Sequence, residues 1–513
     1  MKTYTRKSSV ILRVTRFIVI ALSIIAQAVI SFTIFFKLNE KFVWLQVLNF
    51  FIGAILYLVI VNKDQSAVYK IPWMMLFTLF PVLSVIVYFT FNGRNHFKKI
   101  IISKNDAFSS ESLDYNTPII LKKLENKSEH LSGQARYLTD ACNVPIFNDS
   151  LVKYLASGEE FFSTLLTELN SAKKYVFLEY FIIDDGEMWQ DIFNILKIKA
   201  NNGVQIYISY DDVGSMSRLD KNFIKTLNDN GINCVKFNAF SPILSAVHNN
   251  RDHRKIMVID GKVAFTGGIN IADEYINLKS PYGRWKDSAI LIKGNAVSSL
   301  VKGFCAQYNV SAKQKLNPAD FMVENKAYEN CGYVLPYFDG PNPVYKEHIG
   351  ENAYLNIINQ ATKYLYITTP YLVVDNNVID ALKNASLRGV DVRIMVPEIP
   401  DKKVVNVLTK SNYSRLINSG VKVYEYKGGF IHAKTIVSDN VSVVGTINFD
   451  YRSLIHHYEN AVWFAYNNAT NEVKNDFLTM VEKNSVLITS DMAKQHPLFK
   501  IITGLLYIFS PLF

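Results

Sequence analysis

One pattern that occurs twice constrains this chain more than any other feature. The sequence H-x-K-x-x-x-x-D occupies residues 253–260 and again residues 432–439. Each copy is followed by a glycine and then an asparagine, Asn270 in the first copy and Asn448 in the second. Because so specific a pattern is not expected to recur by chance, the chain is predicted to contain two copies of one structural unit.

The segments that precede the two copies repeat as well. Residues 175–178 have the composition of a buried strand, a helical stretch follows over 188–199, and a glycine leads into a second strand over 203–208. The same order returns from 361–367 to 389–394. This alternation is typical of β-α-β units. The sequence therefore predicts an α/β fold with two similar lobes, 133–325 and 326–495, that face each other across a pseudo-twofold axis.

Each copy of the pattern has the form of a β-hairpin. In the first copy the strand ends at Asp260-Gly261, a strong turn signal, and the chain returns toward Gly267. Side chains alternate along a strand, so His253 and Lys255 are expected on one face. Asp260 does not share that face, and we expect it to close the turn and bind neighbouring backbone.

The second copy is shorter by one residue. Five residues separate Asp439 from Gly445, against six in the first copy. We therefore expect the second hairpin to close differently, and this difference bears on the placement of Thr446 and Asn448.

Histidine, lysine and asparagine that converge without cysteines or clustered carboxylates suit a phosphate ligand. Lysine supplies a point charge and asparagine supplies neutral donors. One histidine can attack phosphorus, but the leaving group also needs a proton, so two histidines with ordinary pKa values near 6.5 can divide the work. The predicted catalytic residues are His253, Lys255, Asp260, His432, Lys434 and Asp439, with Asn270 and Asn448 binding phosphate.

No metal or other cofactor is required by this pattern. The pairs Asp184-Asp185 and Asp211-Asp212 have no spacing that defines a cation site, and strand ends or turns explain them better. The four cysteines lie far apart without C-x-x-C spacing, which favours reduced thiols over a zinc site or a disulfide framework.

The net charge of +10 indicates an anionic partner surface, either membrane phosphate or nucleic acid. Three apolar runs, 17–36, 42–61 and 71–91, favour the membrane, since each has the length that spans a bilayer as a helix. We therefore predict a membrane anchor over 1–100 with two or three transmembrane helices, and a multi-pass protein of the cell membrane. A cleaved signal peptide followed by buried helices is the alternative.

Basic residues flank both ends of this anchor, so the positive-inside rule leaves its topology open. We expect the catalytic lobes on the cytoplasmic side. Residues 101–132 are polar with little apolar periodicity and are predicted to be a linker. The apolar tail over 496–513 is too short to span a bilayer, and could lie in the membrane interface or pack on the second lobe.

These motifs resemble those of the phospholipase D superfamily, where they are known as HKD motifs, and more narrowly those of the bacterial cardiolipin synthases. The resemblance runs over nearly the whole chain. It is carried by Gly267-Gly268-Ile269-Asn270 with the residues up to Tyr275, by Trp285-Lys286-Asp287, by Gly429 to Thr435, and by Asn448-Phe449-Asp450-Tyr451-Arg452-Ser453.

The resemblance implies two phospholipase D-type mixed-sheet lobes and a phosphatidyltransferase without a cofactor. Its substrates would be two phosphatidylglycerol molecules and its products cardiolipin and glycerol. By analogy, His253 would form a phosphatidyl-histidine intermediate, and His432 would protonate the departing glycerol and later deprotonate the second substrate. Asp287 and Glu459 match the acidic positions that orient the two histidines.

Other functions remain open at this point. A phospholipase D-type hydrolase, or a tethered nuclease of the same superfamily, would use the same intermediate. The apolar runs favour a lipid. A nucleic-acid partner is disfavoured because the sequence has no evident stripe of basic residues interleaved with aromatic ones. A membrane scaffold with a dead site is disfavoured because both motifs are intact. The oligomeric state is left open by the sequence.

Overall fold

The computed structural model describes residues 43–63, 67–79, 95–108, 116–239 and 249–508, and the single positions 29, 33, 84, 88 and 510. Most of the chain from Asn95 to Thr503 forms one compact unit, and the residues up to Arg94 belong to a second. The predicted apolar run over 17–36 lies outside the described residues except at positions 29 and 33.

The second unit contains two apolar helices, α2 (Val43–Val61) and α3 (Ala67–Leu79). They correspond to the second apolar run and to the start of the third, and α3 carries Pro72 in its interior. A small apolar cluster forms around Leu56, Ile60, Phe77 and Tyr88. Among the residues that the structure describes, no helix combines the length and the hydropathy that a membrane crossing requires.

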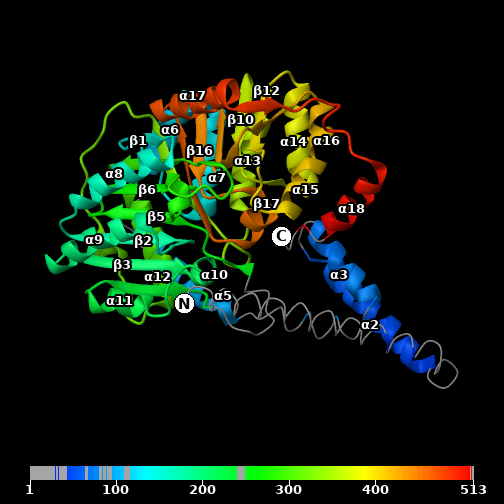
Figure 1. The fold of residues 1–513 in the computed structure, drawn as a ribbon, viewed down its shortest axis with the longest axis horizontal. Coiled ribbons are helices and arrows are strands. Elements are labelled where there is room, and N and C mark those ends of the chain that lie inside the picture. The colour runs from blue at the N-terminus through cyan, green and yellow to red at the C-terminus, as the bar shows by residue number, and fades with distance from the viewer. Residues whose placement is uncertain are drawn as a thin grey trace. The chain divides into compact units, whose positions relative to one another are not determined.

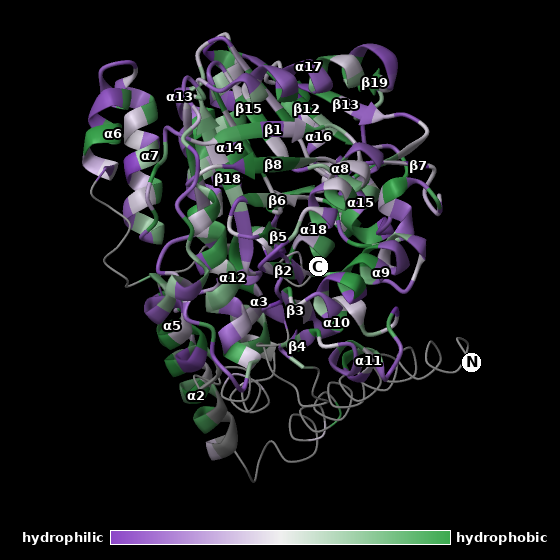
Figure 2. Ribbon diagram, turned by 90° about the vertical axis from the view of Figure 1, so that its left-hand side faces the viewer, coloured by the Kyte–Doolittle hydropathy of each residue, from purple (hydrophilic) through white to green (hydrophobic). Residues whose placement is uncertain are grey.

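Residues 101–132 differ from the expected linker. They contain most of α5 (Asn95–Phe108), all of α6 (Thr117–Glu125) and the start of α7 (Glu129–Cys142). Each helix has one apolar face, and the buried residues of these faces join the main core. In Figure 2, α6 and α7 carry both green and purple residues, as expected of helices that bury a single face. The apolar positions are few, so the polar composition of the segment hid their helical spacing.

The first lobe is built on a seven-stranded mixed sheet in the order β1-β8-β6-β5-β2-β3-β4. Its β2, β3 and β4 are mutually parallel, and the other neighbouring pairs are antiparallel. The strands are β1 (Leu151–Leu155), β2 (Tyr175–Tyr180), β3 (Gln205–Asp211), β4 (Asn233–Phe237), β5 (Lys255–Ile259), β6 (Val263–Gly267) and β8 (Ala289–Lys293).

The second lobe repeats this sheet strand for strand. Its order, β9-β18-β16-β15-β10-β12-β13, matches the first sheet from edge to edge with the same parallel and antiparallel pairs, and β19 adds one further edge. The two-lobe α/β fold is thus confirmed. The strands are β9 (Tyr333–Asp339), β10 (Tyr364–Thr368), β12 (Asp391–Pro397), β13 (Lys422–Tyr426), β15 (Thr435–Ser438), β16 (Val441–Gly445), β18 (Glu459–Ala465) and β19 (Ser485–Leu487).

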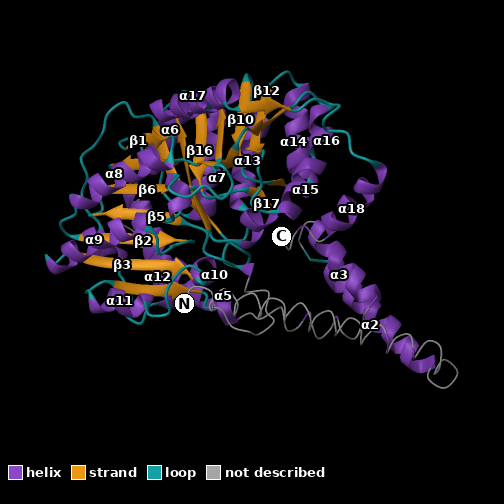
Figure 3. Ribbon diagram, in the orientation of Figure 1, coloured by secondary structure: helices purple, strands orange, loops and turns teal. Residues whose placement is uncertain are grey.

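Helices surround the two sheets, as Figures 1 and 3 show. In the first lobe they are α8 (Gly158–Asn170), α9 (Glu187–Asn201), α10 (Asp212–Ser215), α11 (Phe223–Asp229) and α12 (Val297–Ser311). In the second lobe they are α13 (Ile349–Gln360), α14 (Asn376–Leu387), α15 (Lys403–Ser411), α16 (Tyr413–Ile417) and α17 (Asn468–Lys483). The apolar tail forms α18 (Pro497–Ile508).

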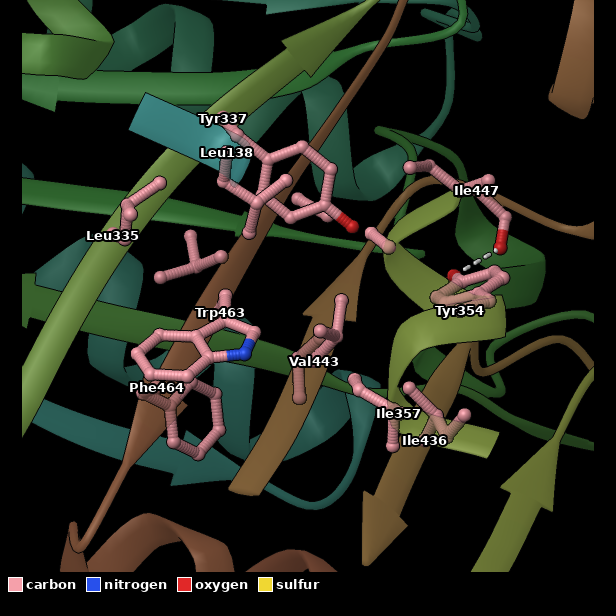
Figure 4. Packing of buried hydrophobic residues seen from close by; sticks show 14 of the residues in the cluster. Leu138, Leu335, Tyr337, Tyr354, Ile357, Ile436, Val443, Ile447, Trp463 and Phe464 are labelled. Atoms are coloured by element: carbon pink, nitrogen blue, oxygen red, sulfur yellow. Dashed lines mark hydrogen bonds between the residues drawn. The ribbon is translucent and has the colours of Figure 1, made fainter. Parts of the chain in front are cut away.

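One hydrophobic cluster contains residues from the sheets of both lobes, while buried residues on the other face of the first sheet, such as Leu178 and Met257, lie outside it. In the second lobe this core packs Trp463 against Leu335 and Val443, and α7 contributes Leu138 from outside the sheet (Figure 4). The indole N–H of Trp463 donates to the side-chain oxygen of Gln134 at 3.0 Å, so its polar atom is satisfied inside the core.

Candidate active site

Both motifs form β-hairpins, as the sequence predicts, and the hairpins close differently. The first pairs Ile259 with Val263 across a three-residue loop, whereas the second pairs Ser438 with Val441 across a two-residue loop. The missing residue is therefore absorbed at the turn. Beyond the turn the two registers agree, because the residue after each lysine pairs with the residue before each glycine, Ile256 with Thr266 in the first lobe and Thr435 with Val444 in the second.

The aspartates of the motifs lie at these turns. Asp260 has a φ of 53° and accepts hydrogen bonds from the amides of Lys173, Lys174 and Tyr175 at 2.7–2.9 Å, which fixes the start of β2. Asp439 does the same for the second lobe, where it accepts from the amides of Thr362 and Lys363 and from the Thr362 hydroxyl. Neither carboxylate bonds a histidine, so the geometry gives both a structural role, as the odd spacing of Asp260 from His253 suggested, and not the catalytic role predicted for them.

The two histidines are paired with carboxylates of the opposite lobe. Nδ1 of His253 lies 2.9 Å from both carboxylate oxygens of Glu459. Nδ1 of His432 lies 2.7 Å from Oδ2 of Asp287. All four side chains are buried. Because each carboxylate holds Nδ1, the Nε2 atom of each ring is the nitrogen left for chemistry.

Backbone pairing between the lobes produces this crossing. The short strands β7 (Arg284–Lys286) and β14 (Gly429–Ile431) run parallel, and the amide of His432 donates to the carbonyl of Lys286 at 2.7 Å. On the other side the amide of His253 donates to the carbonyl of Tyr458 at 2.9 Å. In each case the acceptor is the residue immediately before the carboxylate, so a backbone bond aligns every histidine with its partner.

The two lysines point along the same face as their histidines. Nζ of Lys255 donates to the carbonyl of His253 at 2.5 Å, and Nζ of Lys434 donates to the carbonyl of His432. Burial lowers the pKa of Lys255 to about 7 and that of Lys434 to about 8, and repulsion from Lys434 also lowers the pKa of Lys255. A site that concentrates positive charge in this way stabilises an anion bound between the lobes.

The two histidine pairs differ electrostatically. Burial lowers the pKa of His253 well below its ordinary value and raises that of Glu459 well above it, so neither group favours its charged form. Burial and Lys434 lower the pKa of His432 to about 4, although Asp287 acts in the opposite direction. Burial alone would raise the pKa of Asp287, but His432 and Lys434 lower it, so this carboxylate stays ionised.

The asparagines after the glycines are buried beside the motifs. Asn270 accepts from the amide of Ile182 at 3.0 Å and donates to the hydroxyl of Tyr275 at 2.6 Å. The side-chain oxygen of Asn448 has no hydrogen-bond partner within the described chain. The structure thus places both asparagines at equivalent positions, with Asn448 the less satisfied of the two.

Several neighbours of the histidines were not found from the sequence. His432 lies among the rings of Tyr275, Trp285 and Phe430, with centroid distances of 5.4, 5.5 and 5.8 Å. The hydroxyl of Thr446 donates to Glu459. The positions of Trp285 and Phe430, each two residues before a member of the His432–Asp287 pair, are the sequence signal that could have indicated the aromatic surroundings.

His457 is the other residue that was missed. Its ring lies 5.3 Å from the ring of His253, and both lie against Phe181, at 6.5 and 5.1 Å. The alternation that places His253 and Lys255 on one face also places His457 beside Glu459, two residues later. That signal was present in the sequence.

The acidic pairs that were set aside as cation ligands have other partners. Asp211 binds the buried guanidinium of Arg251 and accepts from the amides of Val213 and Gly214 at the start of α10. Asp184 forms an ion pair with Arg218 at 3.1 Å. Both contacts are of the structural kind that strand ends and turns provide.

Comparison with known proteins agrees with this geometry. Residues 165–299 and 354–481 match the family model described as "Cardiolipin synthase, PLD-like domain", and each matched segment contains one of the two hairpins. A cardiolipin synthase from Halalkalibacterium halodurans is 32% identical over 470 residues, which cover 90% of this chain and 92% of the relative. An uncharacterized protein from Streptococcus mutans is 37% identical over 466 residues, covering 90% of this chain and all of the relative.

Among solved structures, phosphatidylserine synthase from Haemophilus influenzae aligns with a TM-score of 0.57 and 15% identity, covering 74% of this chain and 100% of that one. This likeness concerns the fold, and it agrees with the paired mixed sheets described above. The family resemblance inferred from the motifs is confirmed by these matches. The chain belongs to the cardiolipin synthase family, whose members contain phospholipase D-like domains.

Proposed function

We propose that this protein is a cardiolipin synthase that transfers a phosphatidyl group from one phosphatidylglycerol to another. The observation that carries the proposal is the crossed pair of buried histidine–carboxylate contacts, His253 with Glu459 and His432 with Asp287. A buried lysine donates to the backbone carbonyl of each histidine. The bond that is broken and the bond that is finally formed are both phosphodiester bonds. The energy of the first bond is therefore conserved in the intermediate, and no nucleotide or other cofactor is involved.

His253 acts as the nucleophile and His432 as the acid. Nε2 of His253 attacks phosphorus, the bond from phosphorus to the glycerol oxygen breaks, and His432 transfers its proton to that oxygen. His432 then takes the proton of the second hydroxyl, whose oxygen attacks phosphorus and releases His253. The assignment rests on the two carboxylates: the ionised Asp287 stabilises a protonated His432, whereas burial raises the pKa of Glu459, so this carboxyl gives a protonated His253 less support.

The phosphate-binding groups of this mechanism are Lys255, Lys434, Asn270 and Asn448. The lysines neutralise the charge that builds on the non-bridging oxygens in the transition state. Asn448 supports the assignment because its buried side-chain oxygen is unsatisfied in the described chain, which leaves the amide free to reorient toward a ligand.

A membrane location belongs to the same proposal. The helix α2 exposes Phe50, Phe51 and Leu58 at 73, 58 and 63%, and α18 exposes Ile501 and other apolar residues. Exposed apolar side chains in such numbers favour contact with lipid. Resistance of the membrane-bound protein to extraction with alkaline carbonate would support this location, and release into the soluble fraction would contradict it.

The function is tested with purified protein in vesicles of phosphatidylglycerol. Cardiolipin and free glycerol in equal amounts are expected. Phosphatidic acid without cardiolipin would identify a hydrolase instead, and degradation of a nucleic-acid substrate with no change in lipid would identify a nuclease. A double variant that lacks both histidines, His253→Ala with His432→Ala, provides the background.

A further inference from the structure

A third buried histidine lies beside the nucleophile with no assigned partner. His457 is 7% exposed, and neither of its ring nitrogens has a hydrogen bond within the described chain. Its Nδ1 lies 3.5 Å from Glu459, at the limit of hydrogen-bond distance. A buried imidazole has one donor and one acceptor to satisfy, and leaving both unpaired is costly. Such a side chain is expected to face a ligand.

The charges around His457 are mainly positive. Burial lowers the pKa of His457, and Arg452 makes the largest further contribution in the same direction, ahead of His456, Lys402 and Lys255. Arg452 begins a π-helical turn, Arg452–His456. The amide of His457, which follows the turn, donates to the carbonyl of Arg452 at 2.8 Å. Turns of this kind are frequent at functional sites.

The guanidinium of Arg452 has neither a hydrogen bond nor an ion pair with the residues that the structure describes. Among acidic residues, Asp450 has the largest electrostatic effect on Arg452, and its carboxylate accepts from the amide of Ser453 at 2.8 Å. An arginine that is partly buried and unpaired has five donors to offer to an anion.

Lys402, at the N-terminal end of α15, is a further positive charge that lowers the pKa of His457. Its Nζ lies 4.8 Å above the ring of Tyr371, whose hydroxyl donates to Asp401 at 2.6 Å. Lys402 is itself exposed, so its charge can reach an anion that enters from solvent or lipid. Asp401 and Asp450 form no ion pair with Lys402 or Arg452, although Oδ1 of Asp401 has no hydrogen-bond partner within the described chain.

A divalent cation is the competing ligand for this place. The ligand atoms of His253, His457 and Glu459 lie within 4.8 Å of one another, close enough to be considered as a metal group. However, Arg452 and Lys255 surround the group with positive charge, which raises the cost of a cation and favours an anion. A metal there would also occupy the nucleophilic histidine.

We propose that His457 and Arg452 bind the phosphate of the acceptor lipid, the phosphodiester anion that carries the attacking hydroxyl. This inference rests on the proposed function, because it assigns the second of the two phosphatidylglycerol molecules. A three-carbon glycerol bridge separates the acceptor phosphate from the phosphorus under attack. A positively charged subsite beside His457, whose ring lies 5.3 Å from that of His253, meets that requirement. It also distinguishes an anionic acceptor from water or a neutral alcohol.

The test compares two soluble acceptors that differ by one phosphate. Phosphatidylglycerol serves as donor, and labelled glycerol or labelled glycerol 3-phosphate serves as acceptor in parallel reactions. In the unchanged protein we expect glycerol 3-phosphate to be preferred. In Arg452→Gln and His457→Asn, the ratio of transfer to glycerol 3-phosphate over transfer to glycerol is expected to fall by about tenfold or more.

The matched control is Arg415→Gln, which removes the same charge from an exposed position on α16 of the same lobe, where Arg415 bonds Asn376. Its acceptor ratio should equal that of the unchanged protein. An unaltered ratio in both test variants would overturn the inference while leaving the proposed function intact. If the unchanged protein transfers phosphatidyl groups to neither acceptor and makes no cardiolipin, it is the proposed function that fails.

Binding without turnover covers the case in which a variant loses all transfer. Equilibrium titration with glycerol 3-phosphate is expected to find two sites per chain in the unchanged protein and one in Arg452→Gln. One site in both would contradict the proposal. Zinc titration addresses the competing ligand: stoichiometric Zn²⁺ binding that is lost in His457→Asn would show a metal site and would also overturn the inference.

Discussion

The two halves of the active site share one backbone plan but differ in their chemical surroundings. His253 lies against Phe181 and a second imidazole, and its carboxylate partner is a glutamate whose pKa is raised. His432 lies among three aromatic rings, and its partner is an aspartate whose pKa is lowered. Equivalent strands of the two lobes thus hold carboxylates whose pKa values are shifted in opposite directions. The comparison teaches that duplication supplies the geometry, while side chains outside the motifs separate the nucleophile from the acid.

The largest expected effect separates the two histidines. His253→Ala should lose about 10⁴-fold or more in transfer and form no phosphatidyl-enzyme, because the attacking nitrogen is gone. His432→Ala should still form it when the leaving group is p-nitrophenol, which departs without a proton. The measurement is the burst of p-nitrophenol together with lipid label retained on the protein. A burst in His253→Ala and none in His432→Ala would reverse the assignment.

The carboxylates should follow the histidines of the opposite lobe. Glu459→Gln is expected to resemble His253→Ala, and Asp287→Asn to resemble His432→Ala, each with a smaller loss of about 10²-fold. On the p-nitrophenyl substrate the loss from Asp287→Asn should largely disappear, whereas that from Glu459→Gln should remain. If both variants respond equally to the leaving group, the two histidine–carboxylate pairs do not have separate roles as nucleophile and acid.

The lysines give the comparison a pH dependence. Their lowered pKa values, about 7 for Lys255 and about 8 for Lys434, mean that the empty site loses positive charge as the pH rises above 7. Affinity for dimethyl phosphate, whose own charge is constant, should therefore fall from pH 7 to pH 9, and binding at pH 8 should take up protons. Calorimetry in buffers of different ionisation enthalpy measures both. In Lys255→Met, the fall should begin about one pH unit higher.

The smallest effect concerns the two turns. Asp260→Asn should lower the free energy of unfolding by about 1–3 kcal/mol, because the buried carboxylate accepts from three amides. Asp439→Asn should cost about 0.5–1.5 kcal/mol, since its bonds are exposed. Urea unfolding provides the values, and Asp380→Asn on α14 is the control. A larger loss at Asp439 would contradict the ranking.

Much of this arrangement could be predicted from the sequence because it is local. The spacing from His253 to Gly267 specifies a hairpin, and alternation places Lys255 beside His253 on one face. The single missing residue between Asp439 and Gly445 indicated a different turn. The structure adds that a shorter loop absorbs the difference, so that Asn448 keeps a position equivalent to that of Asn270.

The rest depends on contacts between residues that are distant in the sequence. Which carboxylate meets which histidine follows from β7 and β14 pairing across the lobes, and no local pattern encodes that pairing. The helices of residues 101–132 were missed because few of their positions are apolar. These positions are recognisable as a buried helix face only once the core that they pack against is known. His457 was within reach of the alternation rule, but a single histidine outside the motif gave no reason to apply it.

The crossed hydrogen bonds have a consequence for how such a chain can originate. A lobe by itself would hold a histidine without its carboxylate, so an isolated copy would be inert. Two identical copies related by a twofold axis would complete each other, as in an isologous dimer, but their two histidines would then be equivalent. Joining the copies in one polypeptide removes that equivalence. It allows substitutions such as glutamate at position 459 and aspartate at position 287 to break the symmetry of the centre.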